Sequence, residues 1–251
     1  MTESTITIQL PASTSNCGPG FDTLGIALSL YNFVRVEFRG QGESITAAET
    51  VHSTREAADM ATEVRNAFCL ATALPAHGFH FDIWGEIPAA RGLGSSATLR
   101  AGILMALNEF HGRPLSVSGM IGLIAALDLA PDNATAVFAG GFVVARSHPQ
   151  TAAFVDHIKF SVDEALSFIA IAPDIEVKTR DARALLPKNY PFVDAARSIN
   201  SASYTVAAFA SREYEKLGEA VSDFMHQPYR LRLCPFVEES IAAGVASGEY
   251  T

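Results

Sequence analysis

Hydrophobic and polar residues alternate along several short stretches of the chain, and this period of two predicts β-strands. In residues 5–10, Ile6, Ile8 and Leu10 fall on one face, and Pro11 is expected to end the strand. Other stretches combine apolar residues with neighbouring turn residues in the same way. These further predicted strands cover residues 31–38, 79–84, 140–145 and 166–172.

Longer stretches repeat their apolar residues every three or four positions, which is typical of helices with one buried face. Ala58, Val64 and Phe68 show this spacing, and serines near residue 95 are expected to cap the helix that follows them. Strands and helices alternate without a repeat of fixed period, so the sequence predicts an α+β or mixed α/β fold with a domain boundary near 147–165. Helices are predicted over 54–74, 95–110, 116–128, 192–210, 213–225 and from 236 onward, with a loop over 226–235.

Composition is that of a globular protein and excludes a disordered or collagen-like chain. The 251 residues are 49% hydrophobic and 18% charged, and 18 Lys and Arg against 27 Asp and Glu give a net charge of −9. Such a field disfavours nucleic acids and anionic membranes as main partners. The three cysteines, Cys17, Cys69 and Cys234, are expected to be free thiols. Without a secretory pattern or an apolar run of about 18 residues, a cytoplasmic location is expected.

A glycine- and serine-rich segment between a predicted strand and a predicted helix indicates phosphate binding. Residues 88–98 read PAARGLGSSAT, where glycines allow close backbone approach and serines stand beside free amides at a helix start. The lysine of a Walker A loop is absent. Residues 92–97 also fit the dinucleotide pattern G-x-G-x-x-A, but four residues separate them from the strand and no acidic residue follows at the expected place. A glycine-rich turn capped by serines is the remaining alternative.

Five segments, in order, resemble homoserine kinases of the GHMP kinase superfamily. Residues 88–98 are similar to the superfamily's phosphate loop, and residues 11–25, PASTSNCGPGFDTLG, are similar to the N-terminal signature of the homoserine kinases. The other segments are Pro131-Asp132-Asn133 with Gly140-Gly141-Phe142, Thr179-Arg180-Asp181-Ala182-Arg183 before Leu186-Pro187, and His226-Gln227-Pro228-Tyr229-Arg230. Together they extend over nearly the whole chain.

The resemblance implies an α+β fold of two domains. Residues 1–155 would form the ATP-binding domain, similar to the second domain of ribosomal protein S5, and residues 156–251 a ferredoxin-like domain. ATP and Mg²⁺ would lie in the cleft between them. The implied reaction is transfer of the γ-phosphoryl group to the side-chain hydroxyl of L-homoserine, a step of threonine biosynthesis, and the family is compatible with a homodimer.

The resemblance also assigns site residues. It implies ATP binding by Pro88, Ala90, Arg91, Gly92, Leu93, Gly94, Ser95 and Ser96, and substrate binding by Asn16, Asp22, Thr179, Arg183 and Arg230. Catalytic roles fall to Asp132, Asn133 and Arg183, and Mg²⁺ would be held by Ser96 and Asp128. The alternatives are a plain helix cap for Ser96, a turn or cap for Asp132-Asn133, and solvated charges for the arginines. His77 and His80 are interpreted as structural residues.

Two departures from the family pattern leave the activity open. In the block usually written A-x-E-x-E-G-H-P-D-N, this chain has Ala126 and Asp128 at the two glutamates and Ala130 at the histidine. The printed sequence also ends at Thr251, before the glycine-rich closing segment of the family, so an unpaired edge and an incomplete cleft are expected in the second domain. Three hypotheses follow: a homoserine kinase, a kinase of another small alcohol, and a homologue that binds ligand without turnover.

Overall fold

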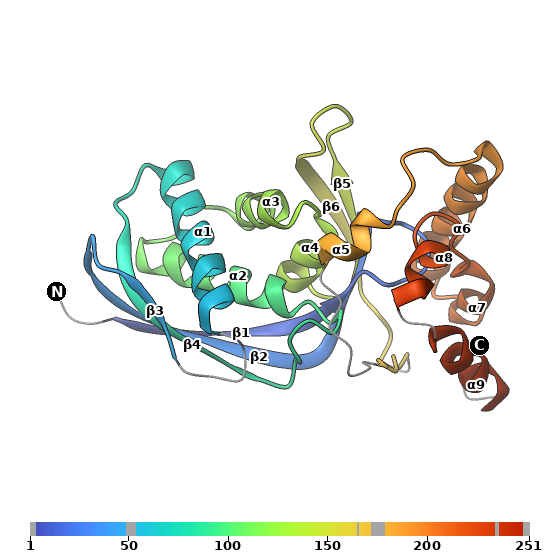
Figure 1. Ribbon diagram of the computed structural model, residues 1–251, viewed down its shortest axis with the longest axis horizontal. Coiled ribbons are helices and arrows are strands. Elements are labelled where there is room, and N and C mark those ends of the chain that lie inside the picture. The colour runs from blue at the N-terminus through green and yellow to red at the C-terminus, as the bar shows by residue number, and fades with distance from the viewer. Residues whose placement is uncertain (1–3, 49–53, 165, 172–178, 234–235, 248–251) are drawn as a thin grey trace.

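The computed structural model describes residues 4–48, 54–164, 166–171, 179–233 and 236–247. Its centre is a six-stranded sheet with the order β3-β4-β2-β5-β6 and with β1 paired to β2. Helices α1 to α4 cover one face of this sheet (Figure 1). The strands are β1 Thr5–Thr14, β2 Leu24–Gln41, β3 Ile45–Ala47, β4 His77–Gly85, β5 Phe142–Ser147 and β6 Phe154–Phe160. The four covering helices are α1 Thr54–Thr72, α2 Ser95–Phe110, α3 Val117–Asp128 and α4 Asp132–Ala139.

Strand β2 is the spine of the sheet because its 18 residues pair with three other strands. Its side chains alternate as a half-covered sheet requires, with Val34, Val36 and Phe38 buried and Arg35 exposed on the other face. The antiparallel partners β1 and β4 pair along most of its length, whereas β5 pairs only with the three residues from Leu24 to Ile26. The start of β2 therefore links the main sheet to the β5–β6 hairpin.

The core lies between this sheet and the helices on it. Fully buried residues of α2 and α3, among them Ile103, Leu104 and Ile121, pack with Val34 and Val36 of β2. Helix α2 comes closest to the strands at Gly102, where an added Cβ would lie 2.6 Å from Val34 Cβ. The absence of a side chain at this position is thus what lets α2 lie directly on β2.

The described residues beyond β6 form helices and connecting segments and contain no strand. Helix α6 contacts the sheet through Phe209, whose ring stacks on Phe142 of β5 at a centroid distance of 3.9 Å and an angle of 12°. Leu24 and Ile26 complete this second, smaller core. The elements of this C-terminal helical region are α5 Thr179–Ala184, α6 Phe192–Ser211, α7 Leu217–Ala220, α8 Gln227–Arg230 and α9 Val237–Ser247, with short 3-10 turns at Tyr214–Lys216 and Leu231–Leu233.

The longest predicted elements are confirmed, including the helices over 54–74, 95–110, 116–128 and 192–210, to within two residues at each end. The predicted end of the first strand at Pro11 is wrong, because the pairing with β2 shifts register between Pro11 and Ala12 and continues to Thr14. Strand β2 likewise starts at Leu24 rather than at residue 31, and α4 was not predicted.

Most differences between the predicted and the observed secondary structure lie after residue 146. No strand is predicted within the expected domain boundary at 147–165, yet β6 lies there, an edge strand whose Val155 and Ile158 are exposed. Residues 166–171 form no strand, and there Phe168, Ile169 and Ile171 are 41%, 62% and 63% exposed. The single helix predicted over 213–225 is a 3-10 turn followed by the four-residue α7, and the loop predicted over 226–235 contains α8.

Other expectations concern domains, thiols and membranes. The predicted boundary between residues 155 and 156 falls inside β6, which pairs with β5, so the sheet extends to Phe160; the division into two domains stays a prediction. Cys17 and Cys69 are free thiols, and Cys234 lies outside the described residues. In the part of the chain that the structure describes, no helix is both long and apolar enough to span a bilayer.

We expect Phe209→Ala to destabilise the protein by about 3–5 kcal/mol, the usual cost of truncating a buried phenylalanine. The physical reason is that the Phe142–Phe209 stack is the main apolar contact of α6 with the sheet. Urea denaturation followed by circular dichroism measures the change. Ile199→Ala, on the same helix but 67% exposed, is the matched control and is expected to change stability by less than about 0.5 kcal/mol. Equal effects of the two variants would contradict this account of how α6 is held.

Candidate active site

The glycine-rich segment lies against the end of strand β1. The Ser13 amide donates a hydrogen bond to the Leu93 carbonyl at 3.2 Å, so the segment continues the backbone pairing of β1. Gly94 has φ +73°, and an added Cβ would lie 2.1 Å from Ser13 Oγ. Both the backbone conformation and the close approach therefore require glycine at this position.

The first turn of α2 is open to an anion. Gly94, not a serine, is the N-cap residue, so the N-cap position supplies no side-chain hydrogen bond to this end of the helix. The predicted serine cap is thus wrong, since Ser95 begins the helix itself and Ser96 is exposed. The amides at the start of a helix are left without intrahelical partners and carry the positive end of its dipole, which is the arrangement that binds phosphate.

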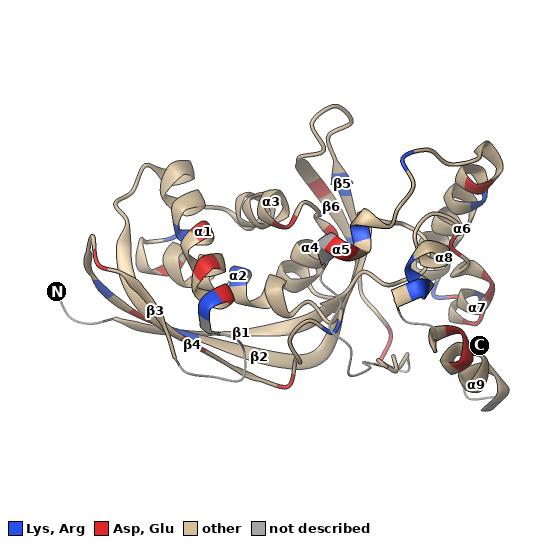
Figure 2. Ribbon diagram, viewed as in Figure 1, with Lys and Arg blue, Asp and Glu red and all other residues tan. Residues whose placement is uncertain are grey.

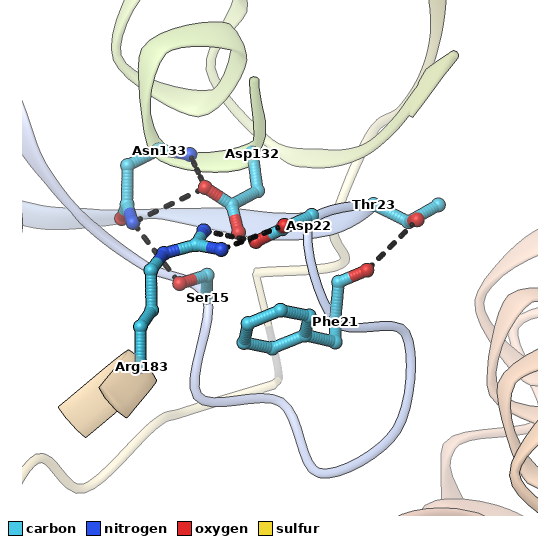
Figure 3. A network of polar contacts seen from close by, with 7 residues as sticks. All are labelled: Ser15, Phe21, Asp22, Thr23, Asp132, Asn133 and Arg183. Carbon is cyan, nitrogen blue, oxygen red and sulfur yellow. Dashed lines mark hydrogen bonds and ion pairs between the residues drawn. The ribbon is translucent and has the colours of Figure 1, made fainter. Parts of the chain in front are cut away.

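Asn133 connects the end of β1 to the start of α4. Its side-chain carbonyl accepts a hydrogen bond from Ser13 Oγ at 2.9 Å. Its side-chain nitrogen donates to Ser15 Oγ at 3.0 Å (Figure 3). The Asn133 amide donates to Asp132 Oδ1 at 2.6 Å. One amide side chain thereby fixes the strand that carries the glycine-rich segment relative to a carboxylate at the N-terminus of α4.

Asp132 is 4% exposed, and burial raises the pKa of its carboxyl to about 6. The backbone amide of Asn133 lowers this pKa, the nearby Asp22 carboxylate raises it, and Arg183 lowers it again. A carboxyl group whose pKa lies close to neutral pH exchanges a proton more readily than an exposed aspartate does. The alternative interpretation of Asp132 is a turn or cap residue. Its burial beside a second carboxylate points instead to a functional role.

A bidentate ion pair joins the segment after β1 to the C-terminal helical region. Arg183 of α5 donates from Nη1 to Asp22 Oδ2 at 3.0 Å and from Nη2 to Asp22 Oδ1, across 161 residues of sequence. Figure 3 shows the guanidinium lying between Asp22 and the Asp132–Asn133 pair. Asp22 adopts the left-handed conformation with φ +56°, which directs its carboxylate toward Arg183. The two residues predicted to meet at the substrate are therefore in direct contact.

Arg230 reaches the same place from α8. Its guanidinium carbon lies 5.1 Å from the centre of the Phe21 ring, and that of Arg183 lies 4.8 Å from the same ring. Burial and the neighbouring Arg183 lower the pKa of Arg230, while Asp22 and Asp132 raise it. Figure 2 shows basic positions on α5 and α8, the short helices that lie between α4 and α6 in that view.

Comparison with known proteins identifies the family. The model of the GHMP kinases N terminal domain matches residues 54–141. The chain is 36% identical over 236 residues to a homoserine kinase of Petrotoga mobilis, covering 93% of this chain and 76% of the relative. It is 34% identical over 244 residues to a homoserine kinase of Caldicellulosiruptor bescii, covering 97% and 78%. The chain belongs to the homoserine kinase family.

A solved structure supports the fold. The crystal structure of homoserine kinase from Cytophaga hutchinsonii superposes with a TM-score of 0.81 at 23% identity, covering 99% of this chain and 81% of that one. The predicted membership of the GHMP kinase superfamily and the α+β kinase fold are thus confirmed. As a member of the homoserine kinase family, the chain is a small-molecule kinase, which removes the dinucleotide-binding alternative for residues 92–97.

The other residues that the sequence predicts to bind substrate or nucleotide lie in three parts of the chain. Asn16 lies beside the glycine-rich segment, since a Cβ on Gly92 would be 3.1 Å from its side-chain nitrogen. Pro88 and Ala90 are exposed, and Arg91 Nη1 donates to the Ala89 carbonyl at 3.5 Å. Thr179 is the first residue of α5, but its side chain lies outside the described residues.

Asp128, predicted to bind the metal, forms an ion pair with Arg100 Nε at 2.9 Å, and Arg100 Nη1 also contacts Glu63 at 2.7 Å. Burial raises the pKa of Asp128 to about 6, although Arg100 lowers it. Within the residues that the structure describes, no group of three His, Cys, Asp or Glu side chains is arranged to hold a metal ion. Asp128 is thus the only carboxylate among the predicted metal ligands, and a guanidinium is its present partner.

Sequence reasoning did not assign roles to Ser13, Ser15, Phe21 or His226, although all four lie in or beside the segments that carry the family resemblance. The sequence signal that could have pointed to these four residues is their polar or aromatic character within those segments. Burial and the Asp132 charge raise the pKa of the Cys17 thiol to about 12, which disfavours the reactive thiolate form. A hollow of about 510 Å³ between α6 and α7 contains none of the predicted site residues.

We expect Asp132→Asn to raise the melting temperature by roughly 5 °C at pH 8, with a smaller difference at pH 5. The folded-state pKa of about 6 lies above the unfolded value of 3.8, so ionising Asp132 as the pH rises costs stability that a neutral asparagine does not lose. Thermal denaturation at both pH values measures this. Asp59→Asn, on the exposed side of α1, is the control, and an Asp132→Asn effect independent of pH would contradict the argument.

Proposed function

We propose that this protein transfers the γ-phosphoryl group of ATP to the side-chain hydroxyl of L-homoserine. The observation that carries the proposal is the meeting of two sites of complementary chemistry. An open helix N-terminus suited to phosphate adjoins a paired carboxylate and guanidinium suited to an amino acid. The homoserine kinase names of the similar proteins supply the substrate.

The phosphate groups would bind the backbone amides of residues 91–96. Gly94 allows this segment to pass close to Ser13 just before α2 begins. Phosphoryl transfer depends mainly on positioning and on neutralising the charge of the transferred group. The dipole of a 16-residue helix and its unpaired amides contribute to both. Ser96, exposed in the first turn, can contact a phosphate oxygen or its counter-ion.

The amino acid would bind at the other end of the site. Its α-carboxylate matches the forked donors of Arg183 and Arg230, and its α-ammonium group matches Asp22. Asn133, held by Ser13 and Ser15, would orient the hydroxyl that is phosphorylated. Asp132, with a pKa of about 6, is mostly ionised above pH 7 and can accept the proton of that hydroxyl as the phosphoryl group is transferred.

We propose Mg²⁺ as the counter-ion of the nucleotide, held by Ser96 and Asp128. The donor set fits in kind, because Mg²⁺ on nucleotides is commonly bound through one or two protein oxygens and the phosphates themselves. When bound, the ion neutralises the phosphate charge. Arg100 keeps the Asp128 carboxylate oriented in its absence, and the ion pair must loosen for Asp128 to contact a metal.

The division of the chain at residues 155 and 156, a homodimer and a cytoplasmic location remain predictions. ATP and a small amino-acid alcohol are the proposed partners, and the net charge of −9 disfavours nucleic acids and anionic membranes.

The proposed function is tested by ADP release with ATP, Mg²⁺ and L-homoserine, against a control without acceptor. We expect turnover that depends on homoserine and a product phosphorylated at the side-chain oxygen. A panel of other small alcohols is measured in parallel. Turnover with another acceptor in preference to homoserine would overturn the substrate assignment, and folded protein that turns over no acceptor would identify a homologue that only binds ligand.

We expect Asp128→Asn to raise the Mg²⁺ concentration for half-maximal activity about tenfold, because it removes the only carboxylate proposed to contact the ion. The KM for homoserine should change little. Glu63→Gln is the matched control, since Glu63 also contacts Arg100 but is not a proposed ligand. Identical metal dependence of the wild type and Asp128→Asn, measured by titrating Mg²⁺ at fixed ATP, would show that Asp128 serves only to hold the helices together.

A further inference from the structure

We propose that Phe21 is a positioning residue whose ring holds the guanidinium groups of Arg183 and Arg230 side by side to receive a carboxylate. The inference deepens the proposed function and rests on it, because it concerns how the same site recognises an amino-acid substrate. Phe21 would not touch the reacting atoms. It would set the distance and tilt of the two arginines that do contact the substrate.

The geometry places one aromatic ring under two cations. The guanidinium carbons of Arg183 and Arg230 lie 4.8 Å and 5.1 Å from the Phe21 ring centre, both within the range of an attractive cation–π contact. The two arginines come from the separate helices α5 and α8, and Phe21 comes from the segment after β1. The ring therefore contacts both guanidinium groups from a third part of the chain.

Two neighbouring guanidinium groups repel each other. Their positive charges are neutralised by carboxylates to different extents. Arg183 is neutralised by its bidentate contact with Asp22. For Arg230, no ion pair with a carboxylate forms within the described part of the chain, and its buried Nε has no hydrogen-bond partner there. The Nε of Arg183 is also buried without a partner. Buried guanidinium donors without partners, one of them on an arginine that has no ion pair, are the features of a site that awaits an anion with oxygen acceptors.

The position of the Phe21 ring is itself set from the C-terminal region. The His226 ring lies 5.3 Å from it, and His226 Nε2 donates a hydrogen bond to the Gly18 carbonyl at 2.6 Å. Burial lowers the pKa of His226, and because a carbonyl can only accept, the contact with Gly18 makes Nε2 a protonated ring nitrogen. Asp223 accepts hydrogen bonds from the amides of His226 and Gln227 at the start of α8. The ring and Arg230 are thus positioned by the same turn.

Space beside Phe21 allows a discriminating set of variants. A cavity of about 190 Å³ adjoins the ring and is lined on its far side by Ser198, Ile199 and Ala202 of α6. A larger aromatic ring can extend into this space, so Phe21→Trp should keep the platform for both arginines. Phe21→Leu keeps an apolar side chain but removes the π face.

The test compares acceptors with and without a carboxylate. The probes are L-homoserine and its amino-diol analogue, in which a hydroxymethyl group replaces the carboxylate. We expect Phe21→Leu to raise the KM for L-homoserine by roughly tenfold, on the scale of losing two cation–π contacts, with kcat and the KM for ATP within about threefold. The KM for the amino diol should be unchanged, and Phe21→Trp should stay within about threefold of the wild type for both acceptors.

Direct binding separates this inference from the proposed reaction. Calorimetry with L-homoserine and the amino diol, without ATP, reports recognition even if no turnover occurs. A loss of homoserine affinity in Phe21→Leu that exceeds the loss for the diol supports the platform, whatever the activity. Equal losses for the two ligands, or equal losses in Phe21→Leu and Phe21→Trp, would show that the ring only shapes the pocket and would overturn the inference. A wild type that binds neither ligand would overturn both.

A second measurement guards against a folding defect. If Phe21→Leu lowers the melting temperature strongly, Phe21→Met takes its place, because the unbranched methionine side chain adapts to an irregular space. Arg230→Met is combined with the Phe21 variant in a double-mutant cycle, and the affinity for L-homoserine is measured for each protein. Because Arg230 would act on the carboxylate through its place on the ring, we expect the combined loss to be smaller than the sum of the single losses. Additive losses would contradict the coupling.

Discussion

The hydrogen bonds of the Asn133 side chain tie the end of β1 to the start of α4 in the candidate site. This amide binds Ser13 and Ser15 at the end of β1, and its backbone nitrogen binds Asp132 at the start of α4. The same stretch of β1 holds the glycine-rich segment through Ser13 and the Leu93 carbonyl. The amides proposed to bind phosphate, a buried carboxylate and the end of β1 are therefore linked to one another through a single polar side chain.

Such a site lowers the stability of the fold that contains it. Asp132 is nearly inaccessible and is destabilised when ionised, and Arg230 carries a buried donor without a partner. The stabilising contacts lie elsewhere, in the core of α1, α2 and α3 on β2 and in the Phe142–Phe209 stack. This separation is expected of an enzyme, where binding of charged ligands supplies the partners that the free protein lacks.

The sequence predicted the elements whose burial follows a simple period, and it failed where pairing decides the structure. Helix α2 was predicted from Ser95 to Phe110 because its apolar residues repeat over four turns. Strand β6 was missed because it is an edge strand with Val155 and Ile158 turned to solvent, so it shows no apolar face. Residues 166–171 are apolar enough for a strand, yet apolar residues alone provide no neighbour to pair with.

The sequence predicted only part of the candidate site, because local patterns can be recognised in a sequence and long-range contacts cannot. The segment proposed to bind phosphate is local, and a few consecutive glycines and serines are enough to indicate its chemistry. The contact of Asp22 with Arg183 spans 161 residues, so only the family resemblance could suggest it. No pattern could show that Asp128 is held by Arg100, or that Phe21 lies beneath two arginines, because both depend on how helices from distant parts of the chain pack.

The segment between β1 and β2 is strained, and its partners explain why it stays so. Asp22 has φ +56°, a conformation that a residue with a Cβ adopts at a cost of about 1–2 kcal/mol. On one side Arg183 holds its carboxylate, and on the other His226 holds the Gly18 carbonyl, so both anchors come from the C-terminal helical region. A substrate that binds Asp22 and the arginines thereby contacts both parts of the chain at once. The proposed recognition of an amino acid at this site therefore depends on the placement of the C-terminal helices.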